Sequence, residues 1–339
     1  MELNATAMAD ARALHSRLTK PPGSLGFLED IGIHLAGIGG TCPPRLPEPA
    51  AVAVFAADHG VVASGVTPWP QEVTAQMVAN FCAGGAAINA VARQVGARLV
   101  VVDVGVASEL APHPDLVVRK VAAGTADLST GPAMTVDQAR AAFAVGEGVA
   151  DSLVGDGVRL LGTGEMGIGN TTPAAALIAA FTGRPPADCT GRGTGIDDGM
   201  LDRKCAVVAT AVERIRGIED PWRVLAEVGG LEIAALAGFV AAGTRARVPV
   251  VVDGVIALAG VLAAEAIAPG TVRACIAGHR STEPGATVAL THLGLRPLLD
   301  LDLRLGEGTG ACLAIPLVQA AARVLREMAT FDSAGVTEK

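Results

Sequence analysis

Short runs of apolar residues recur along the chain, and each leads into glycine or aspartate. The runs cover residues 51–57, 98–104, 158–161, 248–252 and 272–276, with helical stretches between them. A continuous apolar run of this length is typical of a strand that is covered on both faces. The repeated order of strand, loop and helix predicts the α/β class, with a doubly wound, Rossmann-like parallel sheet.

Helices are expected at both ends of the chain. A turn at residues 21–23 separates two helical stretches near the start, and Ser24 is a suitable cap for the second, whose apolar positions recur at helical spacing up to Ile38. Residues 311–328 form a further helical run near the other end. No composition shift or linker marks a domain boundary between these segments.

Composition and charge narrow the classes of partner. Half of the 339 residues are apolar, 42 are glycine and only 3% are aromatic, which suits helices packed closely on a sheet. The net charge of -8 comes without the basic patch that a nucleic-acid phosphate backbone requires, so no nucleic-acid partner is expected.

The cellular setting is expected to be cytoplasmic. The first 20 residues lack the pattern of a secretory signal, and the six cysteines have neither metal-ligand nor redox spacing. The most apolar stretch, residues 248–268, contains Asp253 and Glu265, so no membrane association is expected.

Residues 162–173 form a glycine-rich segment between an expected strand and an alanine-rich helix. With Thr172 as cap and Pro173 in the first helical position, the free N–H groups of the helix start favour a phosphate. Gly162, Gly164 and Gly167 also fit the dinucleotide fingerprint of a nucleotide-dependent oxidoreductase. That fingerprint requires an acidic residue after a following strand, whereas Asp188 lies in a proline-rich loop. A purely structural glycine turn is the third interpretation.

Three more loops carry polar groups. Residues 191–195 are glycine-rich, and Lys204 lies about two turns into the helix expected after them; residues 278–285 place Ser281 before a helix; and Glu307 lies between glycines. Solvated surface charges are the alternative interpretation of Lys204 and Glu307. The six histidines show no metal-ligand spacing, so no metal is expected, although Asp58 and His59 are adjacent and could form a charge pair.

Six ordered segments resemble one known family, the nicotinate-nucleotide:dimethylbenzimidazole phosphoribosyltransferases. They are residues 19–26, 57–61, 72–77, 164–175, 278–281 and 304–310. The resemblance implies transfer of phosphoribose from nicotinate mononucleotide to 5,6-dimethylbenzimidazole or a related base, for the lower ligand of cobalamin, without a cofactor. It also implies a homodimer, a large α/β domain of residues 40–300, and a small helical domain of residues 1–39 with 301–339 that supplies the Glu307 loop.

The resemblance further implies roles for individual residues. Glu307 matches the family's general base. The nicotinate mononucleotide site is expected to contain Glu165, Gly167, Asn170, Thr171, Gly193, Lys204 and Ser281. The acceptor-base pocket is expected to contain Trp69, Gln76, Met77 and Leu305, with a core position as the alternative for Trp69. Besides the oxidoreductase, a non-catalytic nucleotide or base sensor is the competing function.

Overall fold

A single parallel sheet forms the centre of the molecule. The computed structural model describes residues 1–337 and contains six strands in the order β3-β2-β1-β4-β5-β6, every neighbouring pair parallel. The strands are β1 Ala50–Ala57, β2 Arg98–Gly105, β3 Leu116–Val118, β4 Leu160–Met166, β5 Val250–Val252 and β6 Cys275–Ala277. The order reverses between β1 and β4, as it does in Rossmann folds. The predicted doubly wound α/β class is therefore confirmed.

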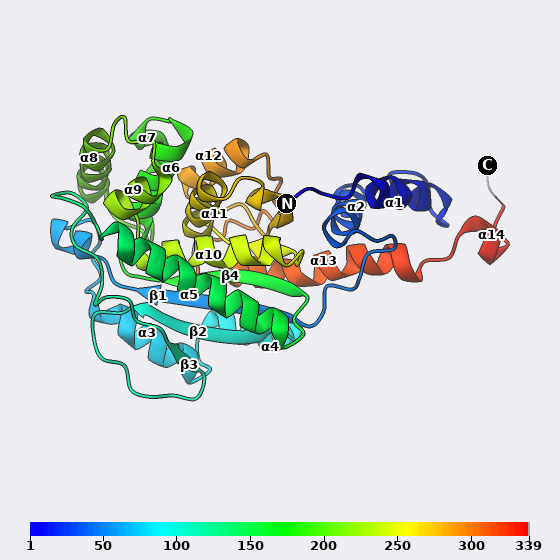
Figure 1. Ribbon diagram of the computed structural model, residues 1–339, viewed down its shortest axis with the longest axis horizontal. Helices are drawn as coiled ribbons and strands as arrows, with labels where there is room; N and C mark the ends of the chain where they lie inside the picture. Colours follow the sequence, from blue (N-terminus) through cyan, green and yellow to red (C-terminus); the bar gives the residue numbers. More distant parts are fainter. Residues whose placement is uncertain (338–339) are drawn as a thin grey trace.

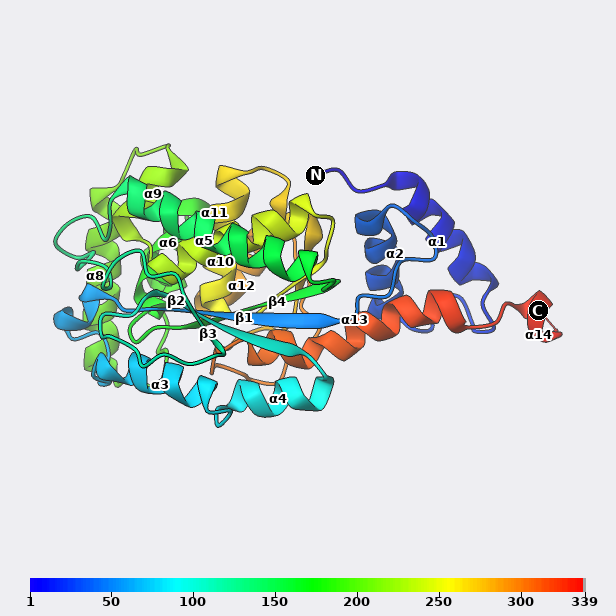
Figure 2. The same ribbon diagram turned by 60° about the horizontal axis from the view of Figure 1, so that its bottom comes forward.

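Helices cover both faces of the sheet (Figure 2). In β1, Ala51, Ala53 and Phe55 point to one apolar core, whereas Val52 and Val54 point to another, because successive side chains alternate. The first core is closed by α5 Val136–Gly155, α6 Thr171–Thr182, α8 Asp198–Arg214, α9 Pro221–Val228, α10 Leu231–Arg245, α11 Val255–Ile267 and α12 Pro284–Leu293. The second is closed by α3 Glu72–Cys82, α4 Ala87–Val95 and α13 Thr309–Glu327.

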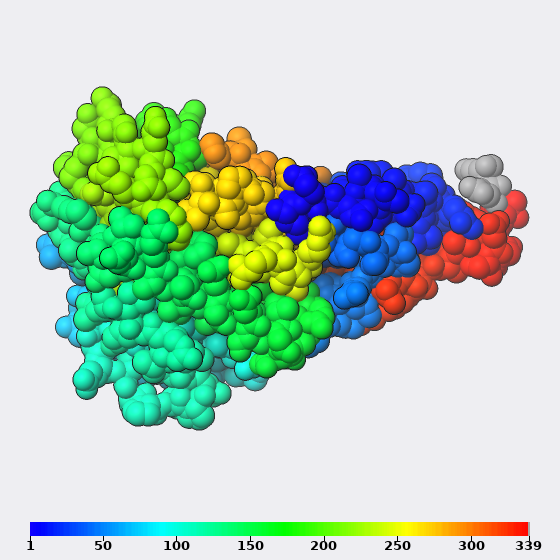
Figure 3. Space-filling view, viewed as in Figure 1, coloured from blue at the N-terminus to red at the C-terminus, as the bar shows by residue number. Residues whose placement is uncertain are grey.

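Helices from the two terminal segments pack together at one end of the molecule, where α1 Ala5–Arg17 and α2 Phe27–Gly39 contact the outer part of α13 (Figures 1 and 3). Ala7, Ala11, Ile33, Ala36 and Leu325 form a small apolar core of their own there. This is the smaller helical domain expected from both termini. The first turns of α13 pack against the sheet. This one helix therefore belongs to both the central α/β part and the small helical part of the molecule.

The proposed domain bounds remain a prediction. Residues 301–339 include two final residues, 338 and 339, that lie outside the described part of the chain. The remaining elements are short: 3-10 turns Gly60–Ser64 and Thr271–Ala274, and helices α7 Pro186–Cys189 and α14 Phe331–Ala334.

Three local expectations were wrong. Helix α2 begins at Phe27 with Gly26 as its N-cap, not at Ser24, because the Glu29 carboxylate accepts hydrogen bonds from Lys20 and the Leu25 N–H and keeps that segment a turn. Helix α6 begins at Thr171, so Thr172 lies inside the helix and Pro173 is its third residue. The loop expected to begin at Gly162 begins later, because β4 continues to Met166.

Within residues 1–337, no helix combines the length and the apolar character needed to cross a membrane.

Candidate active site

A pocket of about 360 Å³ opens at the carboxyl ends of the strands, where the strand order reverses. Ligands of open parallel sheets bind in this crevice. Ten of the predicted site residues line it: Trp69, Met77, Glu165, Gly167, Asn170, Thr171, Gly193, Ser281, Leu305 and Glu307. Lys204 lines a smaller adjoining cavity of about 50 Å³ that shares several walls with the pocket. Gln76 is exposed on α3 and lines neither cavity.

The Glu307 loop has an unusual backbone. Gly306, Glu307 and Gly308 have φ values of 84°, 63° and 87°, a left-handed conformation that costs a non-glycine residue about 1–3 kcal/mol. The loop lies directly on β4, since a Cβ on Gly164 would come within 2.7 Å of the Glu307 carbonyl oxygen. Backbone strain of this kind persists only where the surroundings impose it, and it is concentrated at functional sites.

The Glu307 carboxylate is buried in the pocket wall. One oxygen, Oε2, accepts a hydrogen bond of 3.3 Å from the Ile88 N–H at the start of α4. Burial raises the pKa of Glu307; the bond from Ile88 opposes the rise, and the negative charge of Asp253 adds to it. A carboxylate with a raised pKa is a stronger proton acceptor, as a general base requires.

Glu165 is a second buried carboxyl, at the end of β4. Its Oε2 accepts a hydrogen bond from the Asn170 amide. Burial raises the pKa of Glu165 to about 8, and the charges of Asp253 and Glu307 contribute while Asn170 opposes the rise. At neutral pH the Glu165 side chain is therefore mostly protonated, which lets it donate a hydrogen bond into the pocket.

Lys204 is a buried cation beside the start of α6. Its Nζ donates to Thr171 Oγ1 at 2.8 Å and to the Gly191 carbonyl at 2.9 Å, and burial lowers the pKa of its ammonium group. Across the same loop, the Gly193 N–H donates to Glu283 Oε1 at 2.7 Å. The alternative interpretation of Lys204, a solvated surface charge, was wrong, since only 1% of the residue is exposed.

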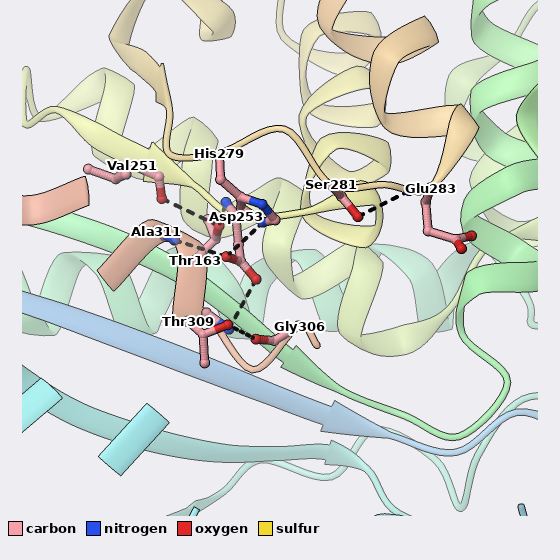
Figure 4. A network of polar contacts seen from close by, with 10 residues as sticks. Thr163, Val251, Asp253, His279, Ser281, Glu283, Gly306, Thr309 and Ala311 are labelled. Atoms are coloured by element: carbon pink, nitrogen blue, oxygen red, sulfur yellow. Dashed lines mark hydrogen bonds and ion pairs between the residues drawn. The ribbon is translucent and has the colours of Figure 1, made fainter. Parts of the chain in front are cut away.

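Ser281 follows β6 and lies buried between His279 and Glu283 (Figure 4). Its Oγ accepts the Glu283 N–H at 3.3 Å, which leaves the hydroxyl proton available to a ligand. Together with Lys204 and the positive end of α6, it makes this side of the pocket suitable for an anion.

Gly162 and Gly164 serve packing rather than a dinucleotide turn. Both lie inside β4, and a Cβ on Gly162 would come within 2.9 Å of Val52 Cγ2. Asp188, the acidic residue considered for a ribose, lies in the short helix α7 and does not line the pocket. The geometry of the dinucleotide fingerprint is therefore absent at this segment of the described chain.

Asp58 and His59 do not form a metal site. His59 Nε2 lies 2.8 Å from Glu232 Oε1, and both side chains are fully buried behind Gly167, whose missing Cβ would come within 3.1 Å of that nitrogen. The portion of the chain that the structure describes contains no group of three or more histidine, cysteine or acidic residues arranged for a metal ion.

Several lining residues were not predicted. They are Val73, Met166, Ile168, Thr194, Gly254, Val255, Ile256, His279, Glu283, Arg304 and Gly306. Asp253, which contacts the Glu307 loop from behind, was also missed. Its sequence signal was an aspartate directly after a buried strand, which Asp58 shares, so it did not stand out.

Trp69 is 49% exposed at the mouth of the pocket, so its alternative assignment to the core was wrong. Trp69, Val73, Met77 and Leu305 give part of the pocket wall an apolar surface, and Trp69 also borders the small cavity that Lys204 lines. The pocket therefore offers both apolar and anion-binding wall to a ligand.

The fold and the pocket define an α/β protein with a ligand site at the point where the strand order reverses, and this site contains groups that suit an anion. The sequence profile of a family described as phosphoribosyltransferase matches residues 1–336. The chain belongs to this phosphoribosyltransferase family.

Relatives and solved structures agree with this assignment. The nicotinate-nucleotide–dimethylbenzimidazole phosphoribosyltransferase of Salinispora tropica is 59% identical, over 99% of this chain and 97% of that protein. The enzyme of the same name from Chloroflexus aurantiacus is 56% identical, over 99% of this chain and 96% of that protein. The crystal structure of CobT from Thermus thermophilus has a TM-score of 0.96 at 51% identity, covering 98% of this chain and all of that one.

Proposed function

We propose that the protein transfers the 5-phosphoribosyl group of nicotinate mononucleotide to 5,6-dimethylbenzimidazole or a related base, giving α-ribazole 5′-phosphate and nicotinate. The names of the relatives support this reaction. The observation that carries it in the structure is Glu307, a buried carboxylate of raised pKa that a strained loop holds in the wall of the pocket.

The reaction needs one proton acceptor. A ring nitrogen of the base attacks C1′ of the ribose with its lone pair, and the bond from C1′ to the pyridinium nitrogen breaks. That bond's electron pair neutralises the nicotinate ring, so the leaving group requires no protonating acid. Glu307 takes the N–H proton from the attacking base, which leaves the product base neutral. Attack opposite the leaving group inverts the anomeric centre from β to α.

The polar side of the pocket receives the nucleotide. Ser281, Lys204, Thr171 and Gly193 are assigned to the part of the site that receives its phosphate, because a buried cation, a hydroxyl and a helix start all favour an anion. Glu165 and Asn170 are assigned to the ribose or nicotinate. Trp69, Met77 and Leu305 are assigned to the acceptor base. Gln76 is the weakest member of that set, since it is exposed outside the pocket.

Two further properties belong to the proposal. We expect a homodimer, which size-exclusion chromatography with light scattering would test. We also expect a cytoplasmic location; the six cysteines are all free in the structure, as is usual in a reducing compartment.

Product analysis tests the reaction. The protein is mixed with nicotinate mononucleotide and dimethylbenzimidazole, with adenine and phenol as parallel acceptors, and the products are identified by mass spectrometry. Formation of α-ribazole 5′-phosphate with an equal amount of nicotinate supports the proposal, and the relative yields rank the acceptors. Binding of substrates without product from any acceptor would indicate the non-catalytic sensor instead.

A further inference from the structure

Asp253 connects the sheet to the Glu307 loop. It follows β5 directly and is buried. Its Oδ2 accepts the Gly308 N–H at 3.1 Å, and its Oδ1 accepts the Ala311 N–H at 2.9 Å (Figure 4). Gly308 is the N-cap of α13 and Ala311 lies in its first turn, so a carboxylate from the loop after β5 satisfies donors that a helix start leaves free.

Asp253 is itself held in place. Its main-chain N–H donates to Thr163 Oγ1 at 2.9 Å, and the Thr163 hydroxyl donates to the Val251 carbonyl at 3.4 Å. His279 Nε2 lies 3.5 Å from Asp253 Oδ1. Thr163 on β4 therefore fixes the main chain of Asp253, and His279 after β6 lies beside its carboxylate, as Figure 4 shows.

This anchor acts on the residue next to Glu307. The left-handed Glu307 is flanked by Gly308, whose N–H is bound to Asp253. Without that bond the loop would lose a restraint on its strained conformation, and the carboxylate would leave the pocket wall for part of the time. A displacement of about 1 Å at a reacting group can reduce a rate by about 100-fold.

We propose that Asp253 is a positioning residue that holds the Gly308 and Ala311 N–H groups and thereby fixes the Glu307 carboxylate in the pocket. This inference rests on the proposed role of Glu307 as base. Asp253 also acts through its charge, because it raises the pKa of Glu307. The other titratable or charged groups that share this pocket are Glu165, His279, Glu283 and Arg304, and the Ile88 N–H faces Glu307 from α4.

The Asp253→Asn variant tests both effects. Its single amide oxygen leaves one of the two N–H groups without an acceptor, so kcat should fall about 10- to 100-fold while the KM for nicotinate mononucleotide changes little. Loss of the negative charge removes one of the causes that raise the pKa of Glu307, so the acid limb of the kcat–pH profile should move to lower pH.

Asp103→Asn is the matched control. Asp103 is equally buried at the end of β2, where it accepts the Val106 N–H at 2.9 Å, but it does not contact the Glu307 loop. If Asp253 had a purely structural role, Asp253→Asn would yield less folded protein, but the acid limb of its kcat–pH profile would stay where it is in the wild type. That result would overturn the proposal. An unchanged kcat in Asp253→Asn would overturn it as well.

Two further measurements keep the test decisive. If Asp253→Asn does not fold, Thr163→Val is the second variant, because it removes a hydrogen bond to Asp253 and keeps the charge of Asp253. Its kcat should fall about fivefold, while the acid limb of its kcat–pH profile stays at the wild-type pH. An unchanged kcat refutes the proposal. If the wild-type protein shows no transfer, the proposed function fails, but ¹³C NMR titration of the Glu307 carboxyl still tests whether Asp253 acts on Glu307. A Glu307 carboxyl signal and pKa that are both identical in wild type and Asp253→Asn would contradict that action.

Discussion

Replacing Glu165 by glutamine should make the stability of the folded protein depend less on a rise in pH. The pKa of Glu165 is raised from 4.5 to about 8, so the folded protein binds a proton there that the unfolded chain releases near pH 4.5. The stabilisation from this proton is complete below the unfolded pKa and is lost as the pH rises through about 8. Glutamine has nearly the same shape and can still accept the Asn170 amide, but it does not titrate.

The size of the effect follows from the shift. Each pKa unit corresponds to about 1.4 kcal/mol of unfolding free energy. Between pH 5.5 and pH 8.5 the unfolding free energy of the wild-type protein should therefore fall by about 2–3 kcal/mol more than that of Glu165→Gln. Other groups with raised pKa values, such as Asp58, titrate in both proteins and largely cancel in the comparison.

Urea unfolding at the two pH values measures this difference, with Glu219→Gln, an exposed position, as control. The control should follow the wild type at both pH values. Equal losses of unfolding free energy in wild type and Glu165→Gln would refute the argument that burial keeps Glu165 protonated.

Three other substitutions separate the parts of the site. Lys204→Met should raise the KM for nicotinate mononucleotide about 10- to 100-fold, because a charged hydrogen-bond donor is lost; an unchanged KM would remove Lys204 from the phosphate site. Gly308→Ala should lower the free energy of unfolding by about 2 kcal/mol more than Gly294→Ala, since both have left-handed backbones but only at Gly308 would a Cβ come within 2.8 Å of a neighbour, Val52 Cγ1. Equal costs in urea unfolding would contradict that packing. Trp69→Ala should raise the KM for the acceptor base about tenfold with little change in Tm, because the ring is half exposed and lines the pocket; an unchanged KM would place the base elsewhere.

The sheet could be predicted because its strands are buried on both faces. Continuous apolar runs such as residues 51–57 and 98–104 have few other interpretations, and they match β1 and β2 closely. The edge strand β3 was missed, since it is three residues long and only partly buried. Short edge strands carry too few apolar positions to be distinguished from loops.

Glycines in β4 caused the largest local error. Gly162 and Gly164 suggested a loop, yet they lie in a strand whose missing side chains make room for Val52 and for the Glu307 loop. A close approach between segments more than 100 residues apart leaves no local pattern in the sequence. For the same reason Asp253 could not be assigned, because its partners Gly308 and Ala311 become its neighbours only in the folded protein.

The role of Glu307 is tested most directly by the turnover of Glu307→Gln. Nicotinate release is followed with saturating nicotinate mononucleotide and dimethylbenzimidazole, and calorimetry checks that the variant still binds the nucleotide. The account predicts a kcat lower by about 10²- to 10⁴-fold at unchanged nucleotide affinity, the usual contribution of a general base. Turnover equal to that of the wild type would contradict it.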